Sequence, residues 1–580
     1  MANRRLYMQM ISFLLILGFV VSLGLSGCSS AKKATGPATT AESSTPEATG
    51  KPASETENKA TPQPETEAVE GSASTEGQRS NFFGIHTMIN NNDNIDQHLD
   101  WAHNLVGDGG YIKQMFSGIT KDTKGPSSNW VDILKGIYKR NMIPIIRVSG
   151  VYTGEYWLKP EATAPGDYSE LAAAIKRVVE QLPLKKGVPL YIEVFNEPNL
   201  TIEWSNSTPN PTDYGHFLVD VSKALRSIGD PRIKVLNGAL SPGGNYNNIR
   251  FVEDMIKTVP ESLHAFDFWA THPYPYDHEP EYNNHDKTAK YKDFTIDSYT
   301  LELELLEKYG RKDTKVVITE TGYELGNNTY GFEGKKAITE ELRTDYIMRA
   351  FRDYWIKWPE IISLCPFEMV SMYVGSDRFD WIYMDSGSDE KGYPTNYHPQ
   401  YEAVASLPKP AYIADPTLKD TEDKNMELVS ANSSNLALKA IPTCSTSIED
   451  YGWSLKKVNN GFTIDTDLGW TTAGDEIEEW LVLEFPQETE MSKVVMVPRS
   501  DGAETGKYFP QAFEIQVSSD GKGWTAVHSV SFNMEYNPGA EAQTYTFVSA
   551  KGKFLRLLIT KKTNHGSGGY HAQLSEVEVY

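Results

Sequence analysis

Between Asn81 and residue 412, short apolar runs alternate with stretches in which apolar residues recur every three or four positions. Short runs rich in β-branched and aromatic residues are typical of buried strands, and the longer spacing is typical of amphipathic helices. The pattern predicts eight strands, each followed by a helix, with the strands at residues 82–86, 111–116, 143–148, 190–195, 233–240, 266–272, 315–320 and 361–367. Eight such units over residues 81–412 predict a (β/α)8 TIM barrel.

Two of the predicted strands end in a glutamate. Pro198 stops the fourth strand and places Asn196 and Glu197 at its carboxyl end, and the seventh strand ends at Glu320. The carboxyl ends of the strands of a parallel barrel surround one mouth, so the two carboxylates are expected to face each other there. The alternative is that each glutamate is only a polar residue that ends a strand.

The periodicity changes after the predicted barrel. Residues 413–434, rich in Pro, Asp, Lys and Asn, read as a linker. From residue 435 to 580 the sequence predicts short alternating strands with no helix of useful length between them, which indicates an all-β sandwich.

The N-terminal residues precede the predicted folds. Arg4 and Arg5 stand before an apolar run at residues 11–25, the layout of a signal peptide over residues 1–27. The Leu-Ser-Gly sequence before Cys28 resembles a bacterial lipobox, which implies lipidation of Cys28 and an exported protein anchored to the outside of the cell membrane. A signal-anchor helix is the alternative. Residues 28–80 contain no aromatic residue and predict a disordered Ser/Thr/Pro/Glu-rich tether.

Composition narrows the range of partners. The chain has 580 residues and a formal net charge of −23, which argues against nucleic acid as the main partner. Three cysteines do not make a disulfide framework. Nothing in the sequence indicates an obligate protein partner.

The Asn-Glu-Pro sequence that closes strand four, together with the glutamate that closes strand seven, resembles the retaining glycoside hydrolases of clan A. The resemblance implies that Glu197 is the general acid/base, that Glu320 is the nucleophile and that Asn196 hydrogen-bonds the sugar 2-hydroxyl. It implies cleavage of O-glycosidic bonds of a polysaccharide by double displacement, with no cofactor for catalysis. The negative charge of Glu320 is expected to keep Glu197 protonated.

Further residues follow from the same resemblance. His272 and Tyr274 end strand six, where many relatives carry a tyrosine that hydrogen-bonds the nucleophile. Arg147 ends strand three, whereas many relatives carry such an arginine on strand two. Strand eight lacks the tryptophan that often lies beneath the sugar, and Trp381 in the following loop is the expected substitute. Trp157 and Trp204, in other predicted loops, are candidate sugar platforms or lid residues.

Two alternative functions are open. The chain is a non-catalytic glycan-binding surface adhesin if its barrel has lost activity. It is a transglycosylase, with the same residues, if water is kept from the covalent intermediate.

The C-terminal region resembles a discoidin, or F5/8 type C, domain in the stretches 435–437, 480–485, 513–521 and 573–580. On bacterial hydrolases such domains usually serve as carbohydrate-binding modules, so the resemblance implies a glycan ligand held by loops at one end. The candidate ligand residues are Arg499, Tyr508, His565 and Tyr570. A structural calcium near Asn460 is also implied, with Asp465 and Asp467 as candidate ligands.

Overall fold

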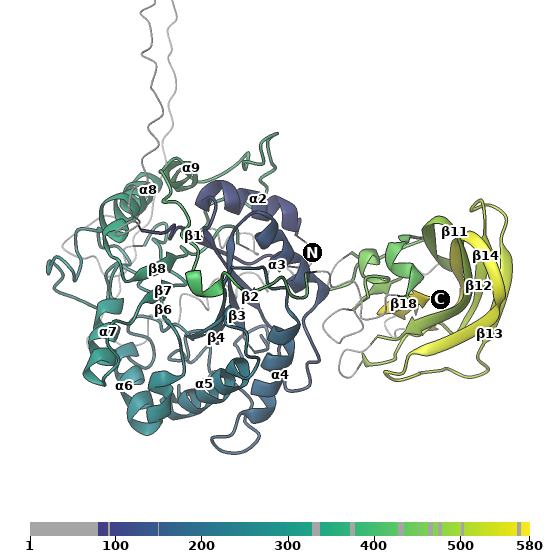
Figure 1. Cartoon of the computed structure of the whole chain (residues 1–580), viewed down its shortest axis with the longest axis horizontal. Coiled ribbons are helices and arrows are strands. Elements are labelled where there is room, and N and C mark those ends of the chain that lie inside the picture. The colour runs from purple at the N-terminus through teal and green to yellow at the C-terminus, as the bar shows by residue number, and fades with distance from the viewer. Residues whose placement is uncertain are drawn as a thin grey trace, which may run out of the picture. The chain divides into compact units, whose positions relative to one another are not determined.

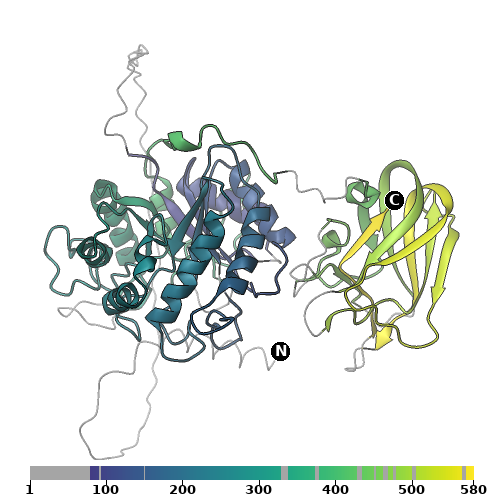
Figure 2. The ribbon, with the colours of Figure 1, turned by 60° about the horizontal axis from the view of Figure 1, so that its bottom comes forward.

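The computed structural model describes residues 79–580, except for 91–92, 149, 328–336, 372–377, 427–433, 450–451, 462–467, 474–477, 500–503 and 565–569. The predicted signal peptide, Cys28 and the tether up to residue 78 lie outside the described residues. The described chain contains an α/β region followed by an all-β region (Figures 1 and 2). Each has a hydrophobic core of its own.

The α/β region contains two parallel sheets. The first has the order β1-β2-β3-β4-β5 and the second the order β6-β7-β8. Parallel bridges between Phe83 and Leu364 and between Leu236 and Phe268 connect the outer strands of the two sheets. The strands are β1 (Gly84–Thr87), β2 (Tyr111–Phe116), β3 (Ile143–Val148), β4 (Leu190–Val194), β5 (Ile233–Asn237), β6 (Trp269–Thr271), β7 (Val316–Ile318) and β8 (Ile361–Leu364).

Helices surround these strands in Figure 1. Their starts follow from local chemistry: the side chain of Asn210 accepts hydrogen bonds from two backbone N–H groups of α5, and Pro211 occupies the first turn, where no N–H partner is needed. The helices are α2 (Ile95–Val106), α3 (Ser128–Lys139), α4 (Ser169–Gln181), α5 (Pro211–Arg226), α6 (Asn248–Thr258), α7 (Tyr299–Lys308), α8 (Glu340–Arg349) and α9 (Pro399–Ala405).

Strand register places charged side chains together within the α/β region. His86 on β1 pairs with Lys113 on β2, and Arg147 on β3 pairs with Glu193 on β4. Paired positions of neighbouring strands present their side chains on the same face of a sheet. All four residues are buried, so they must find their partners inside the protein.

The α/β region extends beyond residue 412. Leu184 and Lys424 exchange two backbone hydrogen bonds of 2.8 and 2.9 Å, and Leu418 is fully buried. Asn425 Nδ2 also donates to the carbonyl oxygens of Glu180 and Leu182. The first part of the predicted linker, up to residue 426, is therefore packed structure, because its backbone pairs with the segment between α4 and β4.

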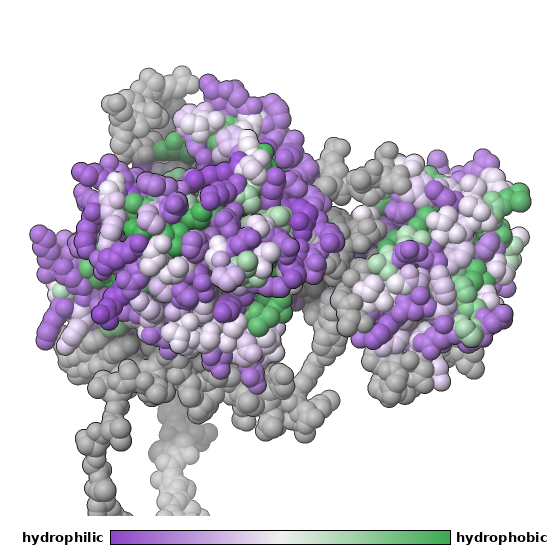
Figure 3. Space-filling model, turned by 90° about the horizontal axis from the view of Figure 1, so that it is seen from below, coloured by the Kyte–Doolittle hydropathy of each residue, from purple (hydrophilic) through white to green (hydrophobic). Residues whose placement is uncertain are grey.

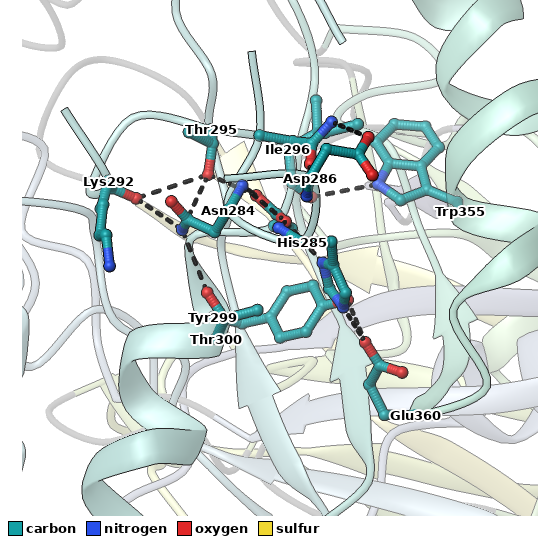
Figure 4. A network of polar contacts seen from close by, with 12 residues as sticks. Asn284, His285, Asp286, Lys292, Thr295, Ile296, Tyr299, Thr300, Trp355 and Glu360 are labelled. Carbon is teal, nitrogen blue, oxygen red and sulfur yellow. Dashed lines mark hydrogen bonds and ion pairs between the residues drawn. The ribbon is translucent and has the colours of Figure 1, made fainter. Parts of the chain in front are cut away.

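A polar network holds the long connection between β6 and α7 (Figure 4). His285 Nδ1 lies 2.6 Å from Asp297 Oδ2 and its Nε2 lies 2.8 Å from Glu360 Oε1, just before β8. The imidazole stacks on Trp358 with ring centroids 4.2 Å apart. Burial acts to lower the pKa of His285, but the hydrogen bonds to the two carboxylates outweigh it and raise this pKa to about 9.

The all-β region confirms the predicted class. Its main sheet has the order β13-β12-β14-β11-β18, and β9 pairs with β11. Alternate residues such as Leu481, Leu483 and Leu557 point into a common core, as a period of two requires. The strands are β9 (Ile441–Cys444), β10 (Trp470–Thr471), β11 (Glu479–Val497), β12 (Ala512–Ser518), β13 (Thr525–Ser531), β14 (Gln543–Lys561), β15 (Thr563–Asn564), β16 (Tyr570–His571), β17 (Gln573–Leu574) and β18 (Glu576–Val579).

Hydrophilic residues predominate on the face of the molecule drawn in Figure 3, with hydrophobic residues scattered among them. Within the described part of the chain, no helix has the length and apolar character needed to cross a bilayer.

Candidate active site

Two glutamates meet beyond the carboxyl ends of β4 and β7. A carboxylate oxygen of Glu197, one of Glu320 and a ring nitrogen of His272 all lie within 4.8 Å of one another. The backbone N–H of Glu197 donates to the carbonyl oxygen of Ala239 at 2.9 Å, which ties the end of β4 to the end of β5. The structure thus brings together the two carboxylates that the sequence placed at strand ends.

Glu320 is held through both carboxylate oxygens. Lys113 Nζ donates to Oε1 at 2.9 Å and the Tyr274 hydroxyl donates to Oε2 at 3.0 Å. Arg147 Nη1 and His86 Nε2 each lie 3.9 Å from Oε1. The hydrogen bond predicted for Tyr274 is present. Together with the one from Lys113, it fixes the orientation of the Glu320 carboxylate.

The charge state of Glu320 follows from these neighbours. Burial acts to raise the pKa of its carboxyl group, but the positive charges of Lys113 and Arg147, with the other basic side chains around it, outweigh burial and hold this pKa well below its usual range. Glu320 is therefore ionised at neutral pH, as a nucleophilic carboxylate must be.

A series of contacts between buried polar side chains connects Glu320 to Glu197. Lys113 Nζ lies 3.2 Å from Glu193 Oε2, and the Thr319 hydroxyl donates to Glu193 Oε1 at 2.9 Å. Thr319 Oγ1 lies 3.0 Å from His272 Nε2, and His272 Nδ1 lies 2.9 Å from Glu197 Oε1. These contacts form a continuous series from Glu320 through Lys113, Glu193, Thr319 and His272 to Glu197.

Asn196 has an unexpected neighbour. Its Nδ2 donates to Glu203 Oε1 at 2.9 Å, while its buried Oδ1 has no hydrogen-bond partner among the described residues. Burial is the largest influence on Glu203 and raises the pKa of its carboxyl group to about 8. Glu203 is thus predominantly uncharged at neutral pH, and the Asn196 carbonyl is the end of the amide that remains for a ligand.

Arg147 and Trp157 lie together beside this pair. The guanidinium carbon of Arg147 is 5.7 Å from the centroid of the Trp157 ring, within the range of a cation–π contact. Arg147 is 7% exposed, and Trp157 is half-buried. Trp157 therefore retains solvent-accessible surface near the glutamates, as a sugar platform requires.

Two predicted platforms are wrong. Trp204 and Trp381 are each 1% exposed. The Trp204 ring packs edge-on against Phe195 and Tyr214, and Trp381 belongs to the same hydrophobic core. A sugar platform needs a ring face open to solvent, and both of these rings are enclosed in the hydrophobic core.

Two other aromatic residues contact neighbours of Glu320. Phe367, which follows β8, and Phe379 are both half-buried, with ring centroids 5.8 Å apart. Phe367 also contacts His86, and Phe379 contacts Tyr274, in each case next to Glu320. Phe367 lies at the end of strand eight, where the family resemblance implies a tryptophan.

Sequence reasoning missed several residues that surround the glutamates: His86, Lys113, Glu193, Glu203 and Thr319. For Lys113 and Glu193 a signal existed, because each is the one charged residue of a predicted buried strand. A charged residue in a buried strand must be paired, which points to an internal polar site.

The spacing of Glu197, His272 and Glu320 would also suit a metal ion. However, Lys113 and Tyr274 already donate to both oxygens of Glu320. A divalent cation would have to displace the ammonium group of Lys113 or stand close to it. The donor set therefore fits carboxylate chemistry better than metal binding.

In the all-β region, two candidate ligand residues meet at Gln573. Arg499 Nη1 donates to Gln573 Oε1 at 3.1 Å, and the Gln573 N–H donates to the Tyr508 carbonyl oxygen at 2.9 Å. Tyr570 is 44% exposed on neighbouring β16. His565 lies outside the described residues.

The candidate calcium ligands Asp465 and Asp467 also lie outside the described residues. The Gly461 N–H donates a hydrogen bond of 3.1 Å to the fully buried Glu576. Carboxylate oxygens are among the ligands that Ca²⁺ takes in proteins.

The all-β region is similar in sequence to a known domain family. Residues 441–574 match the F5/8 type C domain family, so the predicted discoidin-like domain is confirmed. No curated protein matches the chain. One similar solved structure is chitosan-binding module 2 of a chitosanase/glucanase from Paenibacillus sp. IK-5, in complex with chitotriose. Its sequence is 27% identical, the match covers 25% of this chain and 99% of that chain, and the TM-score is 0.20. Another is CpGH89CBM32-5 from Clostridium perfringens in complex with GalNAc-β-1,3-galactose, with 23% identity over 25% and 99% of the two chains and a TM-score of 0.21.

Proposed function

We propose that the protein is a retaining glycoside hydrolase that cleaves O-glycosidic bonds of a polysaccharide. The observation that carries the proposal is the approach of Glu197 and Glu320, whose nearest carboxylate oxygens lie within 4.8 Å. Retaining glycosidases hold their two carboxyl groups about 5–5.5 Å apart, whereas inverting enzymes separate them by about 6.5–9.5 Å.

The proposal includes a (β/α)8 barrel for residues 81–426. The strand order, the parallel pairing and the bridges at both outer edges of the two sheets support it. In such a barrel the functional residues stand beyond the carboxyl ends of the strands. Glu197 after β4, His272 after β6 and Glu320 after β7 have this placement.

In the first chemical step, the ionised Glu320 attacks the anomeric carbon while Glu197 gives its proton to the departing glycosidic oxygen. Lys113 and Tyr274 orient the attacking carboxylate and stabilise its charge. In the second step Glu197 takes a proton from water, the water oxygen attacks the anomeric carbon, and Glu320 leaves. The reaction needs no cofactor.

The F5/8 type C domain is proposed to bind glycan and to hold the catalytic region on a polymer. The modules of known structure that it resembles are described in complex with chitotriose or a galactose-containing disaccharide. Arg499, Tyr508 and Tyr570 are the described candidates for ligand contact. The proposal also includes export and a lipid anchor at Cys28, which the sequence pattern supports.

Calcium binding in this domain is a separate part of the proposal, with Asp465, Asp467 and Glu576 as ligands. Titrating the isolated domain, residues 435–580, with Ca²⁺ should raise its melting temperature, and Mg²⁺ at the same concentration should raise it less. Glu576→Gln should remove the Ca²⁺ effect. An unchanged melting temperature in wild type would exclude this site.

The enzymatic proposal is tested by product stereochemistry. Purified protein is screened against aryl glycosides and polysaccharides, and the first-formed anomer is followed by proton NMR. Retention of configuration is expected, with Glu320→Gln as the inactive control. Inversion would contradict the assignment of Glu320 as nucleophile, and binding without any cleavage would favour a glycan-binding adhesin.

A further inference from the structure

Thr319 occupies the centre of the chain of contacts behind the two glutamates. It is fully buried and lies next to Glu320 in sequence, but its hydroxyl points to Glu193 and His272. Among the described residues, its hydroxyl forms hydrogen bonds with Glu193 and His272 and not with Glu197, the proposed acid. Its contacts nevertheless determine where the hydrogen atoms of His272 lie.

Glu193 determines which way the Thr319 hydroxyl donates. Glu193 is fully buried and forms an ion pair with Lys113, 3.2 Å away, so its carboxylate can only accept hydrogen bonds. The Thr319 hydroxyl has a single hydrogen and donates it to Glu193 Oε1. Thr319 Oγ1 must then act as acceptor in its other contact, with His272 Nε2 at 3.0 Å.

Nε2 of His272 therefore carries a hydrogen. In a neutral imidazole only one ring nitrogen does so, and Nδ1 is left with its lone pair. Nδ1 faces Glu197 Oε1 at 2.9 Å. A hydrogen bond between these atoms needs one proton, and when the imidazole is neutral Glu197 is the group that supplies it.

We propose that Thr319 and Glu193 fix the tautomer of His272, and that this tautomer keeps Glu197 in the protonated form needed for general acid catalysis. Thr319 is then a positioning residue. This inference rests on the proposed glycosidase function and adds to it the origin of the acid proton.

The matched variants are Thr319→Val and Thr319→Ser. Valine has nearly the same shape but no acceptor, so the buried Nε2–H loses its partner and the hydrogen moves to Nδ1. Nδ1–H then donates to Glu197 and favours its ionised form. Thr319→Ser retains the hydroxyl and is the rescue variant.

Kinetics separate this role from a structural one. General acid catalysis contributes about 10²–10⁴-fold and matters most for poor leaving groups. For Thr319→Val we expect kcat/KM to fall about 100-fold on an alkyl glycoside or polysaccharide and less than about tenfold on a dinitrophenyl glycoside. Thr319→Ser should restore the value on the poor leaving group. Equal losses on both substrates, no loss on either, or failure of serine to rescue would overturn the inference.

A second measurement needs no activity. Full-length protein labelled with ¹⁵N-histidine reports the tautomer of each imidazole by NMR, and the His272 signals are assigned by their absence in His272→Asn. Wild type should show the hydrogen on Nε2, and Thr319→Val should show it on Nδ1. A wild-type hydrogen on Nδ1 would overturn the inference. An inactive wild-type protein with the expected tautomer would instead contradict the proposed glycosidase function.

Discussion

Lys113 lies between two buried glutamates, with its Nζ atom 2.9 Å from Glu320 Oε1 and 3.2 Å from Glu193 Oε2. One ammonium group thus serves both the proposed nucleophile and the carboxylate that orders the acid side of the site. The lysine itself has no exposed surface.

Replacing Lys113 with methionine should affect both stability and the pH profile. Removing one partner of a buried ion pair costs about 3–5 kcal/mol of unfolding free energy. The pKa of Glu320 should rise, because one of the interactions that hold it down is lost. We therefore expect the acid limb of kcat/KM to move to higher pH in Lys113→Met, measured beside urea unfolding. An acid limb at the wild-type pH would contradict this role.

His285 should make stability depend on pH. Its pKa in the folded protein is about 9 against an ordinary value of 6.5. The stabilisation is therefore fully present below about pH 6.5 and is lost as pH rises through about 9. His285→Gln should lower the unfolding free energy by about 2 kcal/mol at pH 6. The gap to wild type should close near pH 10, and a gap independent of pH would refute the charged interaction.

The two tryptophans of the loops after β3 and β4 should behave differently. Trp204→Ala should cost about 3–5 kcal/mol of stability, because it opens a cavity in the core. Trp157→Ala should leave stability almost unchanged and raise KM for polymeric substrate several-fold. Urea unfolding and steady-state kinetics on the same preparations make the comparison. A large stability loss in Trp157→Ala would identify it as a packing residue.

The position of the domain boundary can be tested by truncation. A chain ending at residue 426 should fold and cleave small soluble substrates, while binding polymer more weakly than the full chain. A chain ending at residue 412 should be less stable, because the backbone groups of Leu184 lose their partners on Lys424. Equal melting temperatures for the two truncations would show that residues 413–426 do not stabilise the α/β region.

The sequence located the two glutamates because strand ends can be read from apolar runs and the proline that follows. It also pointed to Tyr274, whose hydroxyl donates a hydrogen bond to Glu320. It did not identify Lys113, Glu193 and Thr319 as partners, because that requires strand register and side-chain reach. Lys113 and Glu320 are separated by 207 positions and meet only in the folded chain.

The sequence also does not predict which loop side chains are buried. Trp157 and Trp204 both follow predicted strands, and local sequence does not tell which ring packs against a helix. The predicted linker begins before the packed structure ends for a related reason. Pro, Asp and Lys are typical of loops, but they do not exclude backbone pairing with a distant segment such as the one that contains Leu184.

The most direct test of the central claim, that Glu320 is the nucleophile and Glu197 the acid/base, compares Glu320→Ala and Glu197→Ala on an activated aryl glycoside with added azide. In Glu197→Ala, Glu320 still displaces the aryl oxide, and azide then attacks the glycosyl-enzyme, so the glycosyl azide should retain the substrate's configuration. In Glu320→Ala, azide must attack the anomeric carbon directly, and the product should have the opposite configuration. Retention in Glu197→Ala with inversion in Glu320→Ala is the predicted result, and the same configuration from both variants, or no azide product from either, would contradict the assignment.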